Sequence, residues 1–229
     1  MIDVGLRSIQ ISIDHISGSM RLLGADEAGK GPVIGSMFVA GVVVEEGRLF
    51  DLAAFGVKDS KLLTPPKREQ LASKIETIAL DRYVLEVRPE VIDELRGLMS
   101  MNDIMVKSFS KVVEKLSAER AILDAADVNP IRFARRVKEG SGTKMEVVAE
   151  HRADKNHLVV AAASILAKVE RDRSVREIEK SLGLKIGSGY PSDPATIRFL
   201  EGWLKEHGEL PPFARKSWKT AERIKARFI

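Results

Sequence analysis

The 229-residue sequence contains no cysteine, which excludes disulfide scaffolds, zinc ribbons, iron–sulfur clusters and thiol nucleophiles. It also has no apolar run near the ~18–20 residues that a membrane-spanning helix needs, so we do not expect an integral membrane protein. Residues 1–20 lack the basic start and the apolar stretch of a signal peptide. Together these absences favour a cytoplasmic protein with no membrane partner.

Charged residues are plentiful and unevenly placed. Hydrophobic residues make up 44% and charged residues 31% of the chain, which excludes a disordered protein. The segment 203–229 carries seven lysines and arginines against three glutamates, with Trp203, Phe213, Trp218 and Phe228 interleaved. This basic tail favours a polyanion such as nucleic acid as partner. The alternative is an amphipathic helix packed on the body of the protein.

Hydrophobic periodicity and turn residues predict an α/β protein. The link 27–36 is too short for a crossover helix, so the first two strands should form an antiparallel hairpin. The longest predicted helix is apolar nearly all round in its first half, so that half should lie deep in the fold. The predicted strands are 22–25, 37–44, 83–87, 121–123 and 144–149, with a short further strand at 9–13; the predicted helices are 64–80, 91–98, 101–116, 157–182, 194–207 and a basic helix after 212.

Acidic residues stand at the ends of three apolar elements. Asp26 and Asp124 each follow a predicted strand, Glu27 adjoins Asp26, and Asp154 precedes the longest helix. Acids at the carboxyl ends of central strands lie where ligands bind in α/β sheets, and converging carboxylates need cations such as Mg²⁺ or Mn²⁺ to neutralise them. Taken singly, each aspartate is equally explained as a cap or turn residue, and Asp127 competes with Asp124 for any role.

A phosphate-binding loop is a rival interpretation of the same residues. The segment 24–31 nearly matches the pattern G-x-x-x-x-G-K-[ST]. However, Gly31 replaces the hydroxyl that would hold Mg²⁺, and Asp26 and Glu27 would repel a phosphate. The residues from Val33 onward also predict a strand, whereas such a loop requires a helix N-terminus. These three departures disfavour a nucleotide triphosphatase.

Five blocks of the sequence, in order from Arg21 to the C-terminus, resemble the motifs of the type 2 ribonucleases H, the ribonuclease HII family. The short connections are most similar to those of archaeal members. The resemblance implies a ribonuclease H-like fold: a five-stranded mixed sheet flanked by helices, its first three strands antiparallel and the rest parallel, with a helical C-terminal extension. The blocks are 26–35 (DEAGKGPVIG), 57–61 (VKDSK) with Leu63, Thr64 and Arg68, 124–127 (DAAD), 153–156 (ADKN) with 162–172 (AASILAKVERD), and 187–193 (GSGYPSD).

The resemblance also implies an organisation and an activity. Residues 1–20 would be an N-terminal extension or tag-like segment, 21–182 the catalytic domain and 183–229 the basic C-terminal extension. The family's catalytic and metal-binding acids fall on four positions: Asp26, Glu27, Asp124 and Asp154. With two Mg²⁺ or Mn²⁺ ions, such an enzyme hydrolyses the RNA strand of RNA–DNA hybrids. It also cleaves 5′ of single ribonucleotides embedded in duplex DNA, and leaves 5′-phosphate and 3′-hydroxyl ends.

A glycine-rich loop departs from the family pattern, because Gly29, Lys30 and Gly31 stand where the family has Gly-Arg-Gly. The resemblance implies that this tripeptide holds the RNA–DNA junction through its backbone amides. Lysine keeps the charge of arginine but loses its planar fork. We expect Gly31 to be less replaceable than Lys30 if its backbone conformation is closed to other residues.

Further residues are candidates for contact with nucleic acid. The resemblance implies that Tyr190 stacks on the deoxyribose next to the ribonucleotide, although a tyrosine at the edge of the core is the alternative. Lys61, Lys168 and Arg171 are candidates for binding phosphate, and Lys168 is equally explained as a lysine beside the acids.

Two other functions are compatible with the same sequence. A non-catalytic hybrid-binding module would need the basic tail and Tyr190 but not the four acids. Another nuclease with this fold, such as a junction resolvase or transposase, is the second alternative. We expect a monomer; a sliding-clamp contact is open as a further partner but does not follow from the sequence.

Overall fold

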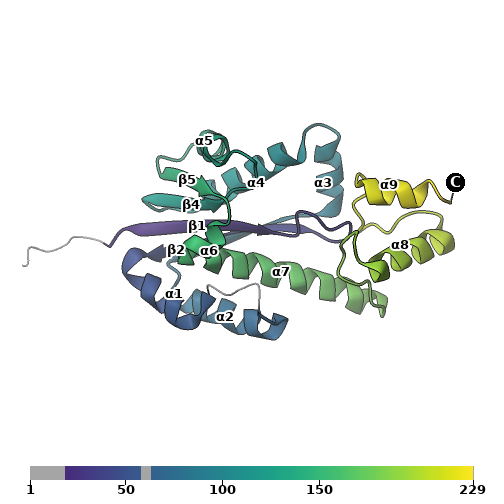
Figure 1. Ribbon diagram of the computed structural model, residues 1–229, viewed down its shortest axis with the longest axis horizontal. Coiled ribbons are helices and arrows are strands. Elements are labelled where there is room, and N and C mark those ends of the chain that lie inside the picture. The colour runs from purple at the N-terminus through teal and green to yellow at the C-terminus, as the bar shows by residue number, and fades with distance from the viewer. Residues whose placement is uncertain (1–18, 58–62, 229) are drawn as a thin grey trace, which may run out of the picture.

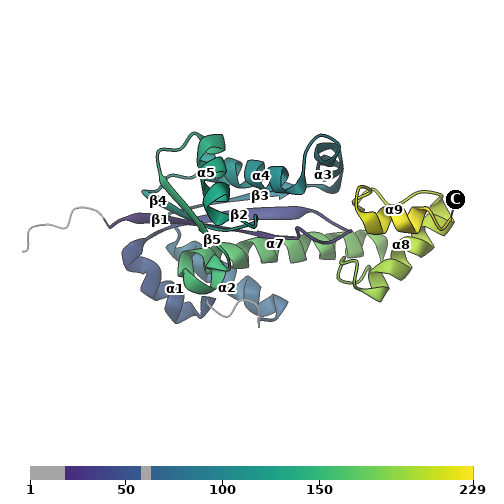
Figure 2. The same ribbon diagram turned by 45° about the horizontal axis from the view of Figure 1, so that its top comes forward.

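The computed structural model describes residues 19–57 and 63–228. A central sheet lies between two layers of helices, and two further helices near the C-terminus lie beyond one end of the sheet (Figures 1 and 2). The predicted strand at 9–13 lies outside the described residues. Within 19–57 and 63–228, no helix is both long and apolar enough to cross a lipid bilayer.

The five strands form one mixed sheet in the order β3-β2-β1-β4-β5. β1 pairs antiparallel with β2, and β2 antiparallel with β3, whereas β4 runs parallel to both β1 and β5. This topology confirms the predicted hairpin and the expected division into antiparallel and parallel strands. The strands are β1 (Arg21–Ala28), β2 (Met37–Glu45), β3 (Asp81–Val87), β4 (Arg120–Asp124) and β5 (Glu146–Glu150).

Helices cover both faces of this sheet (Figure 1). α1 (Leu49–Phe55), α2 (Pro65–Ile78) and α7 (Leu158–Leu182) lie on one face, and α3 (Pro89–Arg96), α4 (Met101–Lys115) and α5 (Pro130–Ser141) on the other. The short α6 (Ala153–Asn156) joins β5 to α7, η1 (Glu46–Arg48) precedes α1, and the end helices are α8 (Pro194–His207) and α9 (Lys219–Lys225).

Helix α5 was not predicted, although Phe133, Ala134 and Val137 recur at helical spacing on its buried face. Asn129 caps its N-terminus by accepting a hydrogen bond from the backbone N–H of Arg132 (3.0 Å), and Pro130 occupies the first turn. Gly142 ends the helix with φ +64°. The short helices α1 and α6 were not predicted either, since neither contains enough turns to establish a period.

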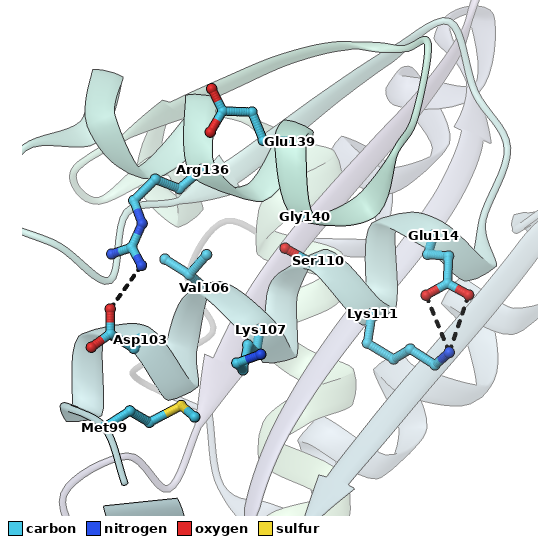
Figure 3. A pocket seen from close by; sticks show the side chains of 10 residues that line it. All are labelled: Met99, Asp103, Val106, Lys107, Ser110, Lys111, Glu114, Arg136, Glu139 and Gly140. Atoms are coloured by element: carbon cyan, nitrogen blue, oxygen red, sulfur yellow. Dashed lines mark hydrogen bonds and ion pairs between the residues drawn. The ribbon is translucent and has the colours of Figure 1, made fainter.

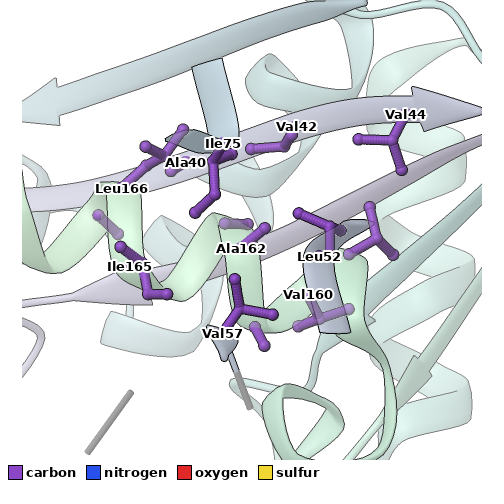
Figure 4. Close-up of a cluster of buried hydrophobic side chains, with 14 of the residues drawn as sticks. Ala40, Val42, Val44, Leu52, Val57, Ile75, Val160, Ala162, Ile165 and Leu166 are labelled. Atoms are coloured by element: carbon purple, nitrogen blue, oxygen red, sulfur yellow. The ribbon is translucent and has the colours of Figure 1, made fainter. Parts of the chain in front are cut away.

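The first half of α7 is buried against β1 and β2, as its all-round apolar sequence predicts. Val160, Ala162, Ile165 and Leu166 lie between the sheet and the neighbouring helices (Figure 4). Gly24 of β1 makes the closest approach: a Cβ built on it would lie 2.3 Å from the carbonyl carbon and oxygen of Val159. This contact fixes the distance between α7 and the strand that carries Asp26.

We therefore expect Gly24→Ala to destabilise the protein by about 3 kcal/mol, because the new methyl group meets backbone that cannot move aside. Gly202→Ala is the matched control. Gly202 lies in α8, and an added Cβ there meets nothing within 4 Å, so the change should stabilise by up to about 1 kcal/mol through helix propensity. Urea unfolding measures both changes, and equal stabilities for the two variants would contradict the close packing of β1 on α7.

Candidate active site

The parallel register of β1 and β4 brings two predicted acids to the same level of the sheet. Ala25 pairs with Leu123, so Asp26 and Asp124 follow at the same level. Side chains of even-numbered β1 residues face α7, since Leu22 and Ala28 belong to the core on that side. Asp26 therefore points toward α7, and so does Asp124, because Ile122 of β4 belongs to the core on the same side.

Glu27 joins these two acids. Oxygens of Asp26, Glu27 and Asp124 all lie within 4.8 Å of one another, and in the described part of the chain this is the group of acids that could hold a metal ion. Asp26 is buried, and the other two side chains are half-buried. Burial, and then the neighbouring Glu27 and Asp124 carboxylates, raise the pKa of Asp26 well above its usual value. Burial likewise raises the pKa of Glu27, against the opposing charge of Lys30.

Helix α7 supplies the polar groups that face Asp26. Ser164, which is fully buried, donates a hydrogen bond that lowers the pKa of Asp26, and the charge of Lys168 acts in the same direction. Lys168 Nζ also donates to Ser164 Oγ, one helical turn earlier. This places Lys168 beside the acids, which is the alternative that the sequence left open for it.

Asp154 lies near this group but is not part of it. It is a buried residue of α6, and the backbone N–H of its neighbour Ala153 donates to Asp124 Oδ1 at 2.7 Å. That bond ties the start of α6 to the end of β4. Asp154 is the next residue after Ala153, so this bond holds it near Asp124 in space. The group of acids within 4.8 Å of one another contains only the other three predicted acids.

Asp127, the competitor of Asp124, has a different environment. Its carboxylate pairs with Arg132 and accepts the backbone N–H of Asn129 at 3.0 Å. Arg132, followed by that backbone bond, lowers the pKa of Asp127. The side chain thus holds the turn that leads into α5, and it takes no part in the group of three acids.

The three clustered acids fit a divalent cation. All the available ligand atoms are carboxylate oxygens, which Mg²⁺ and Mn²⁺ prefer. Glu27 Oε2 is buried and has no hydrogen-bond partner among the described residues, and such an atom is costly unless something binds it. Burial is the main cause of the raised pKa values of Asp26 and Glu27, and the nearby Asp124 carboxylate raises both further.

The glycine-rich loop follows β1 directly, and its two glycines differ. Gly29 has φ +83°, and an added Cβ would lie 2.8 Å from the carbonyl oxygen of Ser36. Gly31 does not have a positive φ, and its added Cβ would make an ordinary contact of 3.6 Å with the Tyr190 ring. The expectation that Gly31 needs a conformation closed to other residues is therefore wrong; Gly29 is the glycine with that requirement.

Lys30 connects the loop to the end of β4. Its Nζ donates to the carbonyl oxygen of Ala126 at 2.8 Å, and its charge lowers the pKa of nearby Glu27. The Lys30 side chain therefore bonds to the protein itself and lies beside the acids. Arg171 of α7 lies close to the same loop: its Cγ would be 3.2 Å from a Cβ on Gly29, and its guanidinium pairs with Asp172 at 3.1 Å.

Tyr190 belongs to a second loop that is bound to the first. The carbonyl oxygen of Gly189 accepts the N–H groups of Val33 (2.8 Å) and Ile34 (3.2 Å). Tyr190 is 37% exposed, and its ring lies against Gly31. The backbone N–H of Ser188 is the main group that lowers the pKa of Asp193, to about 2, so this carboxylate is ionised at neutral pH and closes the loop.

The basic tail, residues 203–229, was expected to present its charges and aromatic rings to a nucleic acid, and the structure fits this only in part. Trp203 and Phe213 pack against each other, 5.8 Å between ring centroids, instead of facing outward. Arg215, counted among the tail's nucleic-acid-binding charges, is fully buried; for this residue the expectation was wrong. The helix α9 buries Ala221 and Ile224 and exposes its charges, as the packed amphipathic alternative predicts. Lys61 lies outside the described residues.

A hollow lies between α4 and α5, and none of the clustered acids lines it (Figure 3). Arg136 of α5 reaches across it to Asp103 of α4, with a 2.7 Å ion pair. The lining mixes charges of both signs, including Lys107, Lys111 and Glu139. None of the predicted site residues lines it.

The comparisons with known proteins agree with the geometry. The family model described as Ribonuclease HII matches residues 23–221. A relative from Methanothrix thermoacetophila named Ribonuclease HII is 64% identical over 207 residues, which is 90% of this chain and 98% of the relative.

Two solved structures are also similar to this chain. The crystal structure of the ribonuclease H2 from Pyrococcus horikoshii has a TM-score of 0.87 at 44% identity and covers 91% of this chain and 99% of that one. The ribonuclease HII in the PCNA:RNase HII complex from Archaeoglobus fulgidus has a TM-score of 0.81 at 42% identity and covers 89% and 96%.

Proposed function

The chain belongs to the ribonuclease HII family and is a type 2 ribonuclease H; from this premise we propose that it both hydrolyses the RNA strand of RNA–DNA hybrids and cleaves 5′ of single ribonucleotides embedded in duplex DNA. The observation that carries the proposal is the juxtaposition of the three clustered acids with the glycine-rich loop, which begins two residues after Glu27. A loop able to bind the nucleic-acid backbone thus adjoins carboxylates able to hold a cation.

The proposed cofactors are two Mg²⁺ or Mn²⁺ ions. Asp26, Glu27 and Asp124 would hold them, and Asp154, held near Asp124 through the Ala153 N–H bond, would complete the set. When bound, such ions lower the pKa of the attacking water and stabilise the leaving 3′ oxygen, which gives 5′-phosphate and 3′-hydroxyl ends. Lys168 would compensate part of the negative charge, since its own charge lowers the pKa of Asp26.

The two bonded loops would select the junction. The backbone amides of the glycine-rich loop would hold the phosphate beside the ribose, and Gly29, with its left-handed conformation, shapes that loop. The exposed ring of Tyr190, lying against Gly31, would stack on the adjacent deoxyribose. A 2′-hydroxyl is the group by which a protein distinguishes RNA from DNA at such a position.

A catalytic role is favoured over a hybrid-binding module by the acids themselves. Without a cation, burial and the neighbouring Asp124 carboxylate disfavour the charged forms of Asp26 and Glu27, whose pKa values are raised, and the carboxylates would also repel the phosphates of a bound duplex. We further propose a cytoplasmic monomer that acts in DNA replication and repair. A sliding-clamp contact is proposed from the Archaeoglobus fulgidus complex with PCNA.

Three labelled duplexes test this proposal: one with a single ribonucleotide in DNA, one long RNA–DNA hybrid and one of DNA alone. With Mg²⁺ or Mn²⁺ the protein should cleave the first two and leave the third intact. Chelation by EDTA should stop both reactions. Cleavage of the hybrid alone would contradict the proposed recognition of single ribonucleotides.

Tyr190→Ala should reduce cleavage of the single-ribonucleotide duplex more than cleavage of the long hybrid. Only the first substrate fixes a deoxyribose next to the ribonucleotide, and loss of the ring would remove stacking worth roughly 1–3 kcal/mol, or about fivefold to 150-fold. Tyr190→Phe keeps the ring and is the control. The ratio of cleavage rates on the two substrates is the measurement, and a ratio unchanged in Tyr190→Ala would return this residue to a structural role at the edge of the core.

A further inference from the structure

Arg215 makes an unusual set of contacts beneath the glycine-rich loop. Its guanidinium donates to the carbonyl oxygens of Gly29 (2.6 Å), Lys30 (2.9 Å) and Gly35 (2.9 Å). The residue is 0% exposed. A planar fork of five N–H donors suits such a task, because one rigid group can satisfy several acceptors at once.

Trp218 extends this arrangement to the next carbonyl. Its Nε1–H donates to the carbonyl oxygen of Gly31 at 3.2 Å. The guanidinium carbon of Arg215 lies over the Trp218 ring, 4.9 Å from the ring centroid. Three successive carbonyl groups of the loop, those of residues 29–31, are therefore held by two side chains from the C-terminal segment.

The direction of these carbonyls fixes the direction of the amides. In a trans peptide the C=O of one residue and the N–H of the next point opposite ways, and no peptide bond in the described chain is cis. The N–H groups of Lys30 and Gly31 therefore point away from buried Arg215. Neither donates a hydrogen bond to another described residue, and Gly31 is exposed. Two adjacent, unbonded N–H groups form a site suited to a phosphate oxygen.

The charge of Arg215 is not balanced by a direct ion pair. No carboxylate of the described residues lies within 4.0 Å of its guanidinium. Asp93 is the nearby acid that acts on it through space, but its oxygens accept bonds from the backbone N–H groups of Lys216 (2.7 Å) and Ser217 (3.0 Å). Burial lowers the pKa of Arg215 to about 10, so the side chain remains charged at neutral pH.

We propose that Arg215, assisted by Trp218, is a positioning residue for substrate binding: it holds three loop carbonyls inward so that the Lys30 and Gly31 amides present a preformed site to a nucleic-acid phosphate, and its buried charge makes that site electropositive. The proposal rests on the proposed function for the identity of the ligand. It assigns to the C-terminal segment a part in binding that its exposed lysines do not explain.

The test compares Arg215→Lys and Trp218→Phe with wild type on the single-ribonucleotide duplex. Lysine keeps the positive charge, but its single ammonium cannot reproduce the fork. Phenylalanine keeps an aromatic ring at position 218 but removes the hydrogen bond from Trp218 Nε1 to the Gly31 carbonyl oxygen. Arg136→Lys is the control, because Arg136 also ties two segments together, through Asp103, at a distance from the loop (Figure 3). KM and kcat are measured in Mg²⁺, and binding by fluorescence anisotropy in EDTA, below the melting temperature of each variant.

We expect Arg215→Lys to raise KM, and Kd in EDTA, by about tenfold or more, the scale of one to two lost charge-assisted hydrogen bonds, with kcat within about twofold of wild type. Trp218→Phe should raise both by about threefold, and Arg136→Lys should change neither. A folded Arg215→Lys variant with KM and Kd like wild type would overturn the proposal, as would an equal rise in Arg136→Lys. If Arg215→Lys does not fold, Trp218→Phe is the deciding variant, and KM and Kd like those of wild type would then overturn the proposal.

The test of Arg215 and the test of the proposed function can fail independently of each other. Failure of the wild-type protein to cleave the single-ribonucleotide duplex would contradict the proposed function alone. The Kd values in EDTA do not depend on cleavage, and an unchanged Kd in both variants would overturn the role of Arg215 even in a fully active enzyme.

Discussion

Asp26→Asn should abolish cleavage and at the same time stabilise the metal-free protein at neutral pH. The substitution removes the central carboxylate of the group of three, and we expect cleavage to fall by at least about a thousandfold, as for loss of a group that acts on the transition state. Stability should rise because burial and two neighbouring acids disfavour the Asp26 carboxylate, and asparagine carries no charge.

The raised pKa of Asp26 determines how the free energy of unfolding depends on pH. Because the folded-state pKa lies above the unfolded value, this group's stabilisation is fully present below the unfolded pKa, near 4, and is lost as the pH rises through the folded pKa. The variant should therefore be more stable than wild type at pH 7, with a difference that shrinks in acid. Adding Mg²⁺ should stabilise wild type and reduce the difference.

Urea unfolding at pH 7 and pH 4, each with EDTA or Mg²⁺, measures these effects. Asp124→Asn and Asp127→Asn form the matched pair for activity. Asp124 belongs to the acid group, whereas Asp127 is paired with Arg132, so only the first should lose cleavage to the same extent as Asp26→Asn. Full activity of Asp26→Asn in saturating Mg²⁺ would contradict the metal site, and equal losses in the matched pair would contradict the choice of Asp124.

Gly29→Ala should be far more damaging to substrate binding than Gly31→Ala. Gly29 has φ +83°, which costs an L-residue roughly 1–2 kcal/mol, and its new methyl group would also meet the Ser36 carbonyl oxygen at 2.8 Å. The loop must shift, and the amides that follow would lose their alignment. We expect KM for the single-ribonucleotide duplex to rise by about tenfold or more, as for a strain of that size.

Gly31→Ala is the matched comparison within the same loop. Its methyl group would make a 3.6 Å contact with the Tyr190 ring and needs no unusual backbone angle, so KM should stay within about threefold of wild type. Lys30→Ala should also be mild for binding, because its side chain bonds to Ala126 and the proposed contacts are backbone amides. A ranking with Gly31→Ala as the worst of the three would show that the loop binds substrate in another conformation.

The clustering of Asp26 and Asp124 was predictable because strand ends can be located from the local sequence, and parallel central strands present their carboxyl ends at one edge of the sheet. Asp26 and Asp124 each follow a short apolar run, and parallel pairing of those runs necessarily brings them together. The choice between Asp124 and Asp127, by contrast, did not follow from the pattern. It depends on the ion pair of Asp127 with Arg132, which lies in the first turn of α5, a helix that was not predicted.

The support beneath the glycine-rich loop was not predictable from local patterns. Arg215 and Lys216 are adjacent basic residues after a proline pair, yet Arg215 is fully buried and Lys216 is exposed. What separates them is a contact with carbonyls some 180 positions earlier in the chain. Lys30 is similar, since nothing in the sequence indicates that its ammonium bonds to Ala126.

The most direct test of the central claim is the chemistry of the ends produced from a duplex with one ribonucleotide. Metal-assisted attack of water at the acid site predicts cleavage on the 5′ side of the ribonucleotide, only with Mg²⁺ or Mn²⁺ present. One product should end in a 3′-hydroxyl deoxynucleotide and the other should begin with a 5′-phosphorylated ribonucleotide. Cleavage on the 3′ side with a 2′,3′-cyclic phosphate, or cleavage that persists in EDTA, would contradict the account, because the ribose 2′-hydroxyl would then be the nucleophile and the acids would not be needed to hold a metal.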